Sequence, residues 1–127
     1  MIVDNHASAR EAIRDLLSGP GIVIRECASG VEALEAARDF QPDWIIMDLH
    51  MPGLSGLEAS ALIRKEFPSV RIVILSFEDA PHLRLAAQEI GVVAYVAKEH
   101  FPSLRDLLWS GASNGNPNPQ QRKNGLL

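Results

Sequence analysis

Residues 45–53 read IIMDLHMPG, an apolar run that ends on Asp48 and passes at once into a Pro-Gly turn. The apolar residues 45–47 show no alternation with polar ones, as in a parallel strand that is buried on both faces. Asp48 therefore stands at the tip of a buried strand, where its charge needs a partner. The question is what the rest of the chain brings to that tip.

The length of 127 residues suits one domain with its own hydrophobic core. The single cysteine, Cys27, cannot form an intramolecular disulfide, which agrees with a reducing compartment, and we interpret it as a buried packing residue. No apolar run approaches the ~20 residues that span a bilayer, and no basic segment with an apolar core marks a secretion signal. We expect a cytoplasmic protein that does not associate with membranes.

Charge and motif spacing exclude several function classes. The formal net charge is −4 and the twelve basic residues form no stripe, so we expect no direct nucleic-acid binding by this chain. The histidines lie far apart and show no CxxC or HxxxH spacing, which argues against a zinc site. They are His6, His50, His82 and His100. No GxGxxG or Walker motif is present.

Short apolar runs alternate with segments of helical period, which indicates βαβ units around a parallel sheet. The runs predict five strands, at 1–4, 21–27, 44–48, 70–76 and 92–96. An apolar stripe over 9–17 predicts the first helix, and S-x-x-E capping boxes at Ser29 and Ser55 predict where the second and third begin. Helical spacing over 83–90 and 104–108 predicts the last two. The expected fold is α/β, a doubly wound (βα)₅ sheet.

The two ends of the chain differ from the middle, because the C-terminal end lacks apolar periodicity and the first strand is short. From Gly111 the sequence is rich in Gly, Asn, Pro and Gln without an apolar period, which predicts a folded domain over 1–110 and a flexible linker or tail over 111–127. The predicted first strand is short against the usual ~5–6 residues. This leaves open that native residues precede it and that an output domain follows the tail.

Polar residues follow the predicted strands where each strand ends. Asp4, Asp48 and Ser76 close three strands, and Lys98 lies just past the fifth, at the edge where open α/β sheets bind ligands. Two carboxylates with the amide oxygen of Asn5 suit Mg²⁺, an ammonium suits an anion, and a hydroxyl can meet a phosphoryl oxygen. Singly, each residue could be a helix cap or part of an ion pair. Together they predict phosphoryl transfer through an aspartyl-phosphate.

The chain resembles the receiver domains of two-component response regulators from Ile2 to Trp109. The matching stretches are IVDNH at 2–6, ASGVEAL at 28–34, PDWIIMDLHMPGLSG at 42–56, VRIVILS at 70–76 and GVVAYVAKE at 91–99. VDNHASAR further resembles receivers that precede helix-turn-helix output domains. The resemblance implies a flavodoxin-like sheet of order 2-1-3-4-5, a sensor histidine kinase as partner, and an output domain or downstream protein.

The resemblance also implies roles for the residues at the strand tips. Asp48 would be the phosphoacceptor, Lys98 would pair with the phosphoryl group, and Ser76 would contact it. Mg²⁺ would be held by Asp4, Asn5, Asp48 and the backbone carbonyl of His50. Ser76 and Tyr95 would form the switch that changes the surface of the fourth helix, fifth strand and fifth helix; an ordinary half-buried tyrosine is the alternative for Tyr95. The family ties phosphoryl lifetime partly to side chains at His50 and Glu78.

Asn5 departs from the family pattern, which usually has two acids where this chain has Asp4-Asn5. An amide oxygen lacks the charge that offsets the dehydration of Mg²⁺, so metal affinity should fall. This motivates an alternative function, a degenerate receiver that binds a partner without phosphorylation.

A third hypothesis belongs to another class, a phosphatase with His50 as general acid. The chain has no cap domain to enclose a substrate, so we expect no enzyme activity beyond self-catalysed phosphoryl transfer and autodephosphorylation. A flavin or nucleotide binder is disfavoured because the loop after the first strand lacks glycine. The oligomeric state, a homodimer included, stays open.

Overall fold

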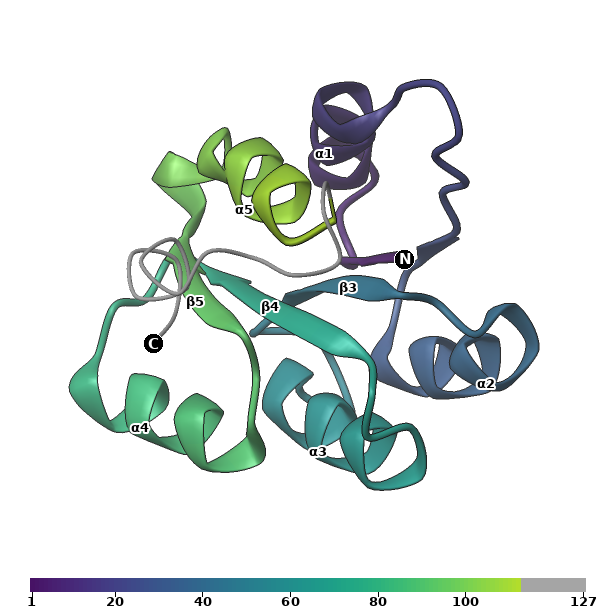
Figure 1. The fold of residues 1–127 in the computed structure, drawn as a ribbon. Helices are drawn as coiled ribbons and strands as arrows, with labels where there is room; N and C mark the ends of the chain where they lie inside the picture. Colours follow the sequence, from purple (N-terminus) through teal and green to yellow (C-terminus); the bar gives the residue numbers. More distant parts are fainter. Residues whose placement is uncertain (113–127) are drawn as a thin grey trace.

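The computed structural model describes residues 1–112 and shows a parallel five-stranded sheet with helices on both faces (Figure 1). Its elements are β1 (Ile2–Val3), α1 (Ala7–Leu17), β2 (Glu26–Cys27), α2 (Gly30–Phe40), β3 (Trp44–Asp48), α3 (Gly56–Glu66), β4 (Arg71–Ser76), α4 (Pro81–Ile90), β5 (Ala94–Ala97), the 3₁₀ helix η1 (Lys98–His100) and α5 (Ser103–Ala112). The strand order β2-β1-β3-β4-β5 confirms the predicted doubly wound fold. No helix of this part of the chain is long and apolar enough to cross a membrane. The predicted tail lies outside the described residues from residue 113 onward.

Helices α1 and α5 cover one face of the sheet, and α2, α3 and α4 cover the other (Figure 1). Strand β3 contributes to both resulting cores: Ile45 and Met47 pack on the side of α2 to α4, whereas Ile46 packs on the side of α1 and α5. This is why residues 45–47 are apolar without alternation. Two covered faces leave the strand ends as the places where polar groups can gather.

The helix starts follow the predicted capping residues. In α3 the capping box is complete, because the Ser55 hydroxyl accepts from the Glu58 N–H at 3.2 Å and the Glu58 carboxylate accepts from the Ser55 N–H at 3.3 Å. In α2 the Ser29 hydroxyl accepts from the Glu32 N–H, but the Glu32 carboxylate accepts from the N–H of Ala28 instead. Both predicted starts are confirmed, and the reciprocal pair forms at α3.

The predicted second strand over 21–27 is wrong in length, because only Glu26 and Cys27 pair with a neighbour. Its partner β1 is itself two residues long, with Ile2 opposite Glu26, so the chain before Glu26 has no strand beside it. Ile22 and Val23 are 45% and 75% exposed as a result. The ends of β1, β4 and β5 also differ from the predicted ones by one or two residues.

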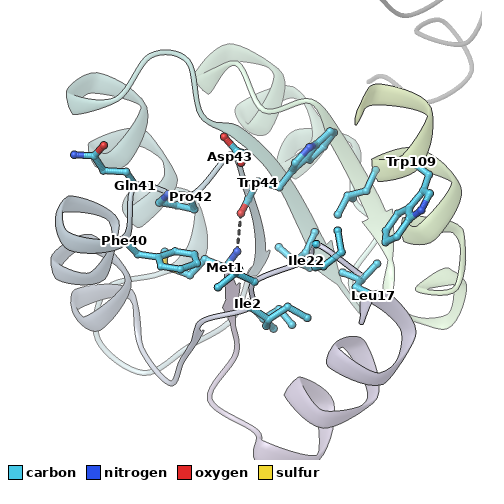
Figure 2. Close-up of a pocket in the computed structure, with 15 residues that line it drawn as sticks. Met1, Ile2, Leu17, Ile22, Phe40, Gln41, Pro42, Asp43, Trp44 and Trp109 are labelled. Atoms are coloured by element: carbon cyan, nitrogen blue, oxygen red, sulfur yellow. Dashed lines mark hydrogen bonds between the residues drawn. The ribbon is translucent and has the colours of Figure 1, made fainter. Parts of the chain in front are cut away.

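An apolar groove of about 460 Å³ opens at the amino ends of β1 and β3 (Figure 2). It is lined by the chain over 21–24, the turn over 40–44 and the last turns of α5, among others. Figure 2 shows the backbone nitrogen of Met1 directed at the carbonyl oxygen of Trp44, to which it donates at 2.7 Å. Since Asp48 lies at the carboxyl end of β3, the groove and the polar strand tips stand at opposite ends of the sheet.

Candidate functional site

Three of the predicted site residues meet at the carboxyl edge of the sheet. Asp4 follows β1, Asp48 ends β3, and Lys98 begins η1 directly after β5. The Lys98 ammonium donates to Asp4 Oδ2 at 3.1 Å and lies 2.9 Å from Asp48 Oδ1. The Lys98 ammonium thus bridges two carboxylates. They lie 44 positions apart in the sequence, at the ends of the neighbouring strands β1 and β3.

The bridge is buried, which sets its electrostatics. Asp4 is 0% and Asp48 4% exposed. Burial raises the pKa of Asp48 above its ordinary value, against the hydrogen bond from Lys98, and the neighbouring Asp4 charge raises it further. For Lys98 burial works to lower the pKa, but the hydrogen bonds and charges of Asp48 and Asp4 outweigh it and hold the pKa above its ordinary value. Lys98 is therefore a fixed positive charge beside Asp48.

Ser76 and Tyr95 are connected through the backbone of a single residue, Glu78. The hydroxyl of Ser76, which is buried at the end of β4, accepts from the Glu78 N–H at 3.0 Å. The hydroxyl of Tyr95, buried on β5, donates to the Glu78 carbonyl oxygen. The loop between β4 and α4 is thereby tied to both side chains. Nothing in the sequence around Glu78 signals this role, because backbone groups carry it.

Two side chains face each other between the loops that follow β3 and β4. His50 stands two residues after Asp48, and its Nε2 lies 3.5 Å from the carboxylate of Glu78, two residues after Ser76. Both side chains are more than half exposed. The influence on phosphoryl lifetime that the resemblance implies for these two positions stays a prediction.

The start of α3 packs directly on the backbone of Asp48. The Gly56 N–H donates to the Leu49 carbonyl oxygen at 2.9 Å, and a Cβ on Gly56 would lie only 2.0 Å from the Asp48 carbonyl oxygen. Only glycine permits this approach. The loop between Asp48 and Gly56 is therefore held from both ends, with Gly53 at φ +77° in its turn.

The donor atoms at this edge fit a divalent cation. One oxygen each of Asp4 and Asp48 and one nitrogen of His6 lie within 4.8 Å of one another. The side-chain oxygen of Asn5 is buried and has no hydrogen-bond partner among the described residues. A buried oxygen without a partner needs one, and a cation can supply it. The sequence analysis did not place His6 among the metal ligands. Its position two residues after Asp4 was the signal that could have indicated this role. The part assigned to the His50 carbonyl stays a prediction.

Sheet topology and site together define a doubly wound α/β domain with a buried acidic site at its strand tips. Residues 1–108 match the family model described as response regulator receiver domain. The chain therefore belongs to the receiver domains of response regulators, which confirms the resemblance seen in the sequence. Receiver domains serve as phosphoacceptors in two-component signalling and bind Mg²⁺ at an acidic pocket.

Individual relatives agree with this assignment. The nitrate/nitrite response regulator protein NarL of Escherichia coli K12 is 34% identical over 110 residues, which cover 85% of this chain and 50% of NarL. The chain spans about half the length of the curated relatives NarL and NarP. The signal receiver domain of the putative response regulator NarL from Mycobacterium tuberculosis superposes with a TM-score of 0.79 at 26% identity, covering 89% of this chain and 94% of that one.

A further solved structure contains a modified aspartate. It is a response regulator protein from Burkholderia pseudomallei with a phosphorylated aspartic acid, a calcium ion and citrate. It superposes with a TM-score of 0.77 at 25% identity and covers 90% of this chain and 68% of that one.

Proposed function

We propose that Asp48 accepts a phosphoryl group from a partner histidine kinase and that this event switches the surface formed by α4, β5 and α5. The observation that carries the proposal is the buried bridge in which the Lys98 ammonium contacts both Asp48 and Asp4. An ammonium fixed 2.9 Å from a carboxylate oxygen can neutralise charge on a phosphoryl group attached to that oxygen.

In the transfer step, a carboxylate oxygen of Asp48 attacks phosphorus while the bond between phosphorus and the donor's imidazole nitrogen breaks. The electron pair of that bond stays on the imidazole, and the product is a mixed anhydride on Asp48. Lys98 is in place to compensate the charge that develops on the phosphoryl oxygens. Asp4, Asn5, Asp48 and the His50 backbone carbonyl would hold Mg²⁺, which when bound supplies further positive charge to those oxygens.

The switch follows from the contacts around Glu78. Phosphorylation adds roughly −1.5 to −2 charges at the strand tip. The Ser76 hydroxyl accepts from the Glu78 N–H and keeps its own proton to donate, so a phosphoryl oxygen on Asp48 could accept that proton and draw Ser76 toward it. Movement of Ser76 would free the Glu78 N–H and thereby shift the carbonyl to which Tyr95 donates. Since α4 begins at Pro81, three residues after Glu78, its position would change with the loop.

The partners and context of the domain belong to the same proposal. A sensor histidine kinase would supply the phosphoryl group, and an output domain or a downstream protein would respond to the switch. Relatives include the transcriptional regulatory protein YdfI of Bacillus subtilis, which supports a regulatory output, although this chain itself has no basic stripe for nucleic acid. We place the receiver domain at residues 1–110 with a linker after it, in a cytoplasmic protein.

The direct test is phosphorylation in vitro. The protein is incubated with acetyl phosphate or phosphoramidate and Mg²⁺, and its intact mass is measured. Wild type and an Asp106→Asn variant, altered at an exposed aspartate on α5, should both gain one phosphoryl mass, whereas Asp48→Asn should gain none. No gain in the wild type, or an equal gain in Asp48→Asn, contradicts the proposal.

A second function is supported by one observation, the neutral Asn5 where the family usually has a second acid. It fits a receiver that holds its partner-binding surface permanently, without phosphorylation. Backbone NMR shifts decide between the two functions. If phosphodonor and Mg²⁺ leave the amides of α4, β5 and α5 unchanged in wild type as in Asp48→Asn, the domain is a phosphorylation-independent interaction module.

A further inference from the structure

We propose that His6 is a direct ligand of the cation at this site, so that the site binds transition-metal dications such as Co²⁺ and Zn²⁺ in preference to Mg²⁺. The inference rests on the metal site of the proposed function, but its test does not require phosphorylation. It concerns the side chain of His6, to which neither the sequence interpretation nor the comparisons assign a role.

The position of the imidazole supports ligation. His6 Nδ1 lies 3.3 Å from Asp4 Oδ1, and a His6 nitrogen belongs to the group of donor atoms that lie within 4.8 Å of one another. Two donors that bind one ion at a right angle with bonds of about 2.1 Å stand about 3.0 Å apart. The three donors therefore need to close by up to about 1.8 Å to share an ion, which side-chain rotations can supply.

The imidazole is available for this role. His6 is the N-cap residue of α1, but its side chain makes no capping hydrogen bond, and 67% of it is exposed. The backbone is fixed, because the His6 N–H donates to Asp4 Oδ1 at 2.8 Å. The His6 backbone is thus held in place beside the site, while its exposed imidazole is free to rotate toward a bound cation.

Lys98 and His6 use different oxygens of Asp4. The ammonium donates to Oδ2, whereas the imidazole approaches Oδ1. A cation on the His6 side would therefore leave the contact between Lys98 and Asp4 in place. The unpartnered Asn5 oxygen, on the residue between Asp4 and His6, offers a further neutral donor.

Charge and donor type together predict the metal preference. Asp4 and Asp48 contribute two negative charges and Lys98 one positive charge, so the three side chains sum to −1. An acid in place of Asn5 would make the sum −2. Mg²⁺ is held by charged oxygens, whereas imidazole suits Co²⁺, Ni²⁺ and Zn²⁺, which also bind more tightly in general. The site therefore carries less negative charge than a pair of acids would give it for Mg²⁺, and it offers an imidazole that transition metals favour.

The experiment titrates the 127-residue chain with CoCl₂ in the absence of phosphodonor. Visible absorption gives the affinity, and hyperfine-shifted imidazole N–H signals in the ¹H NMR spectrum show whether a histidine is bound. The variants are His6→Ala and His82→Ala, the latter removing another exposed imidazole, on α4. Calorimetry with MgCl₂ supplies the comparison cation.

Wild type and His82→Ala should show the shifted imidazole signal, and His6→Ala should lose it. His6→Ala should also weaken Co²⁺ binding by at least about tenfold while changing Mg²⁺ binding by less than about twofold. Asn5→Asp should strengthen Mg²⁺ binding and so reduce the preference of the site for Co²⁺ over Mg²⁺. No imidazole signal in the wild type, a signal that survives in His6→Ala, or equal weakening of both metals would overturn the inference.

The outcomes separate this inference from the proposed function. If wild type gains no phosphoryl mass but shows the His6-dependent signal, the phosphoacceptor role fails and the metal ligand stands. If His6→Ala is phosphorylated with Mg²⁺ as well as wild type is, but wild type shows no imidazole signal, the phosphoacceptor role stands and His6 is only a neighbour of Asp4.

Discussion

Substitution of Gly56 tests whether the contact between α3 and Asp48 sets the site. A Cβ at this position would lie 2.0 Å from the Asp48 carbonyl oxygen and 2.9 Å from the Leu49 Cα, whereas real Cβ contacts essentially never fall below 3.0 Å. The Cβ and the Asp48 carbonyl oxygen must therefore move apart by at least 1.0 Å, from 2.0 to 3.0 Å. Because both contacted atoms belong to the backbone, the movement must displace either α3 or the Asp48 loop.

We expect Gly56→Ala to lower the free energy of unfolding by about 1 to 3 kcal/mol, the usual effect of an extra methyl group in a packed site. A displacement of about 1 Å at a reacting group can slow its reaction by roughly 100-fold, so phosphorylation of Asp48 should slow toward that extent. Urea unfolding gives the first quantity. The rate of mass gain with acetyl phosphate and Mg²⁺ gives the second.

Gly19→Ala is the matched control. Nothing lies within 4 Å of a Cβ at Gly19, and its backbone is not in the left-handed region. Alanine there should leave the phosphorylation rate unchanged and stabilise the fold by up to about 1 kcal/mol, through a less flexible unfolded chain. If Gly56→Ala matched Gly19→Ala in stability and rate, the contact between Gly56 and Asp48 would not control the site.

Two further predictions concern residues outside the site. Ser55→Ala removes half of the α3 capping box and should destabilise the fold by about 1 kcal/mol in urea unfolding, whereas Ser69→Ala, at an exposed serine, should stay within about 0.5 kcal/mol of wild type. Burial, and after it the charge of Glu32, raises the pKa of Cys27 to about 11 from an ordinary 9.0. The native state therefore keeps the thiol proton longer than the unfolded chain does, so its contribution to stability is complete below pH 9 and is lost as the pH rises toward 11. Wild type should lose more unfolding free energy than Cys27→Ala between pH 8 and pH 10.5, and an equal loss would show that Cys27 does not carry the effect.

Local sequence patterns were enough to predict the types of the elements and the sheet edge at which polar groups meet. The positions of Asp48 and Lys98 have a local cause. Each follows an apolar strand, and parallel strands that are buried on both faces leave only their ends for charged residues. The S-x-x-E pair at Ser55 and Glu58 is local in the same sense, and it marked the start of α3 to the residue.

The contacts between strand tips and the lengths of the strands depend on how distant segments pack, and the sequence patterns did not predict them. The apolar residues Ile22 and Val23 are typical of a strand, but pairing depends on a neighbour, and β1 beside them is too short to pair with them. The bridge from Lys98 to Asp4 joins residues 94 positions apart, and Glu78 connects Ser76 to Tyr95 through backbone atoms that every residue has. Local patterns follow from the preferences of a residue and its near neighbours, whereas these contacts arise only when the sheet brings distant segments together.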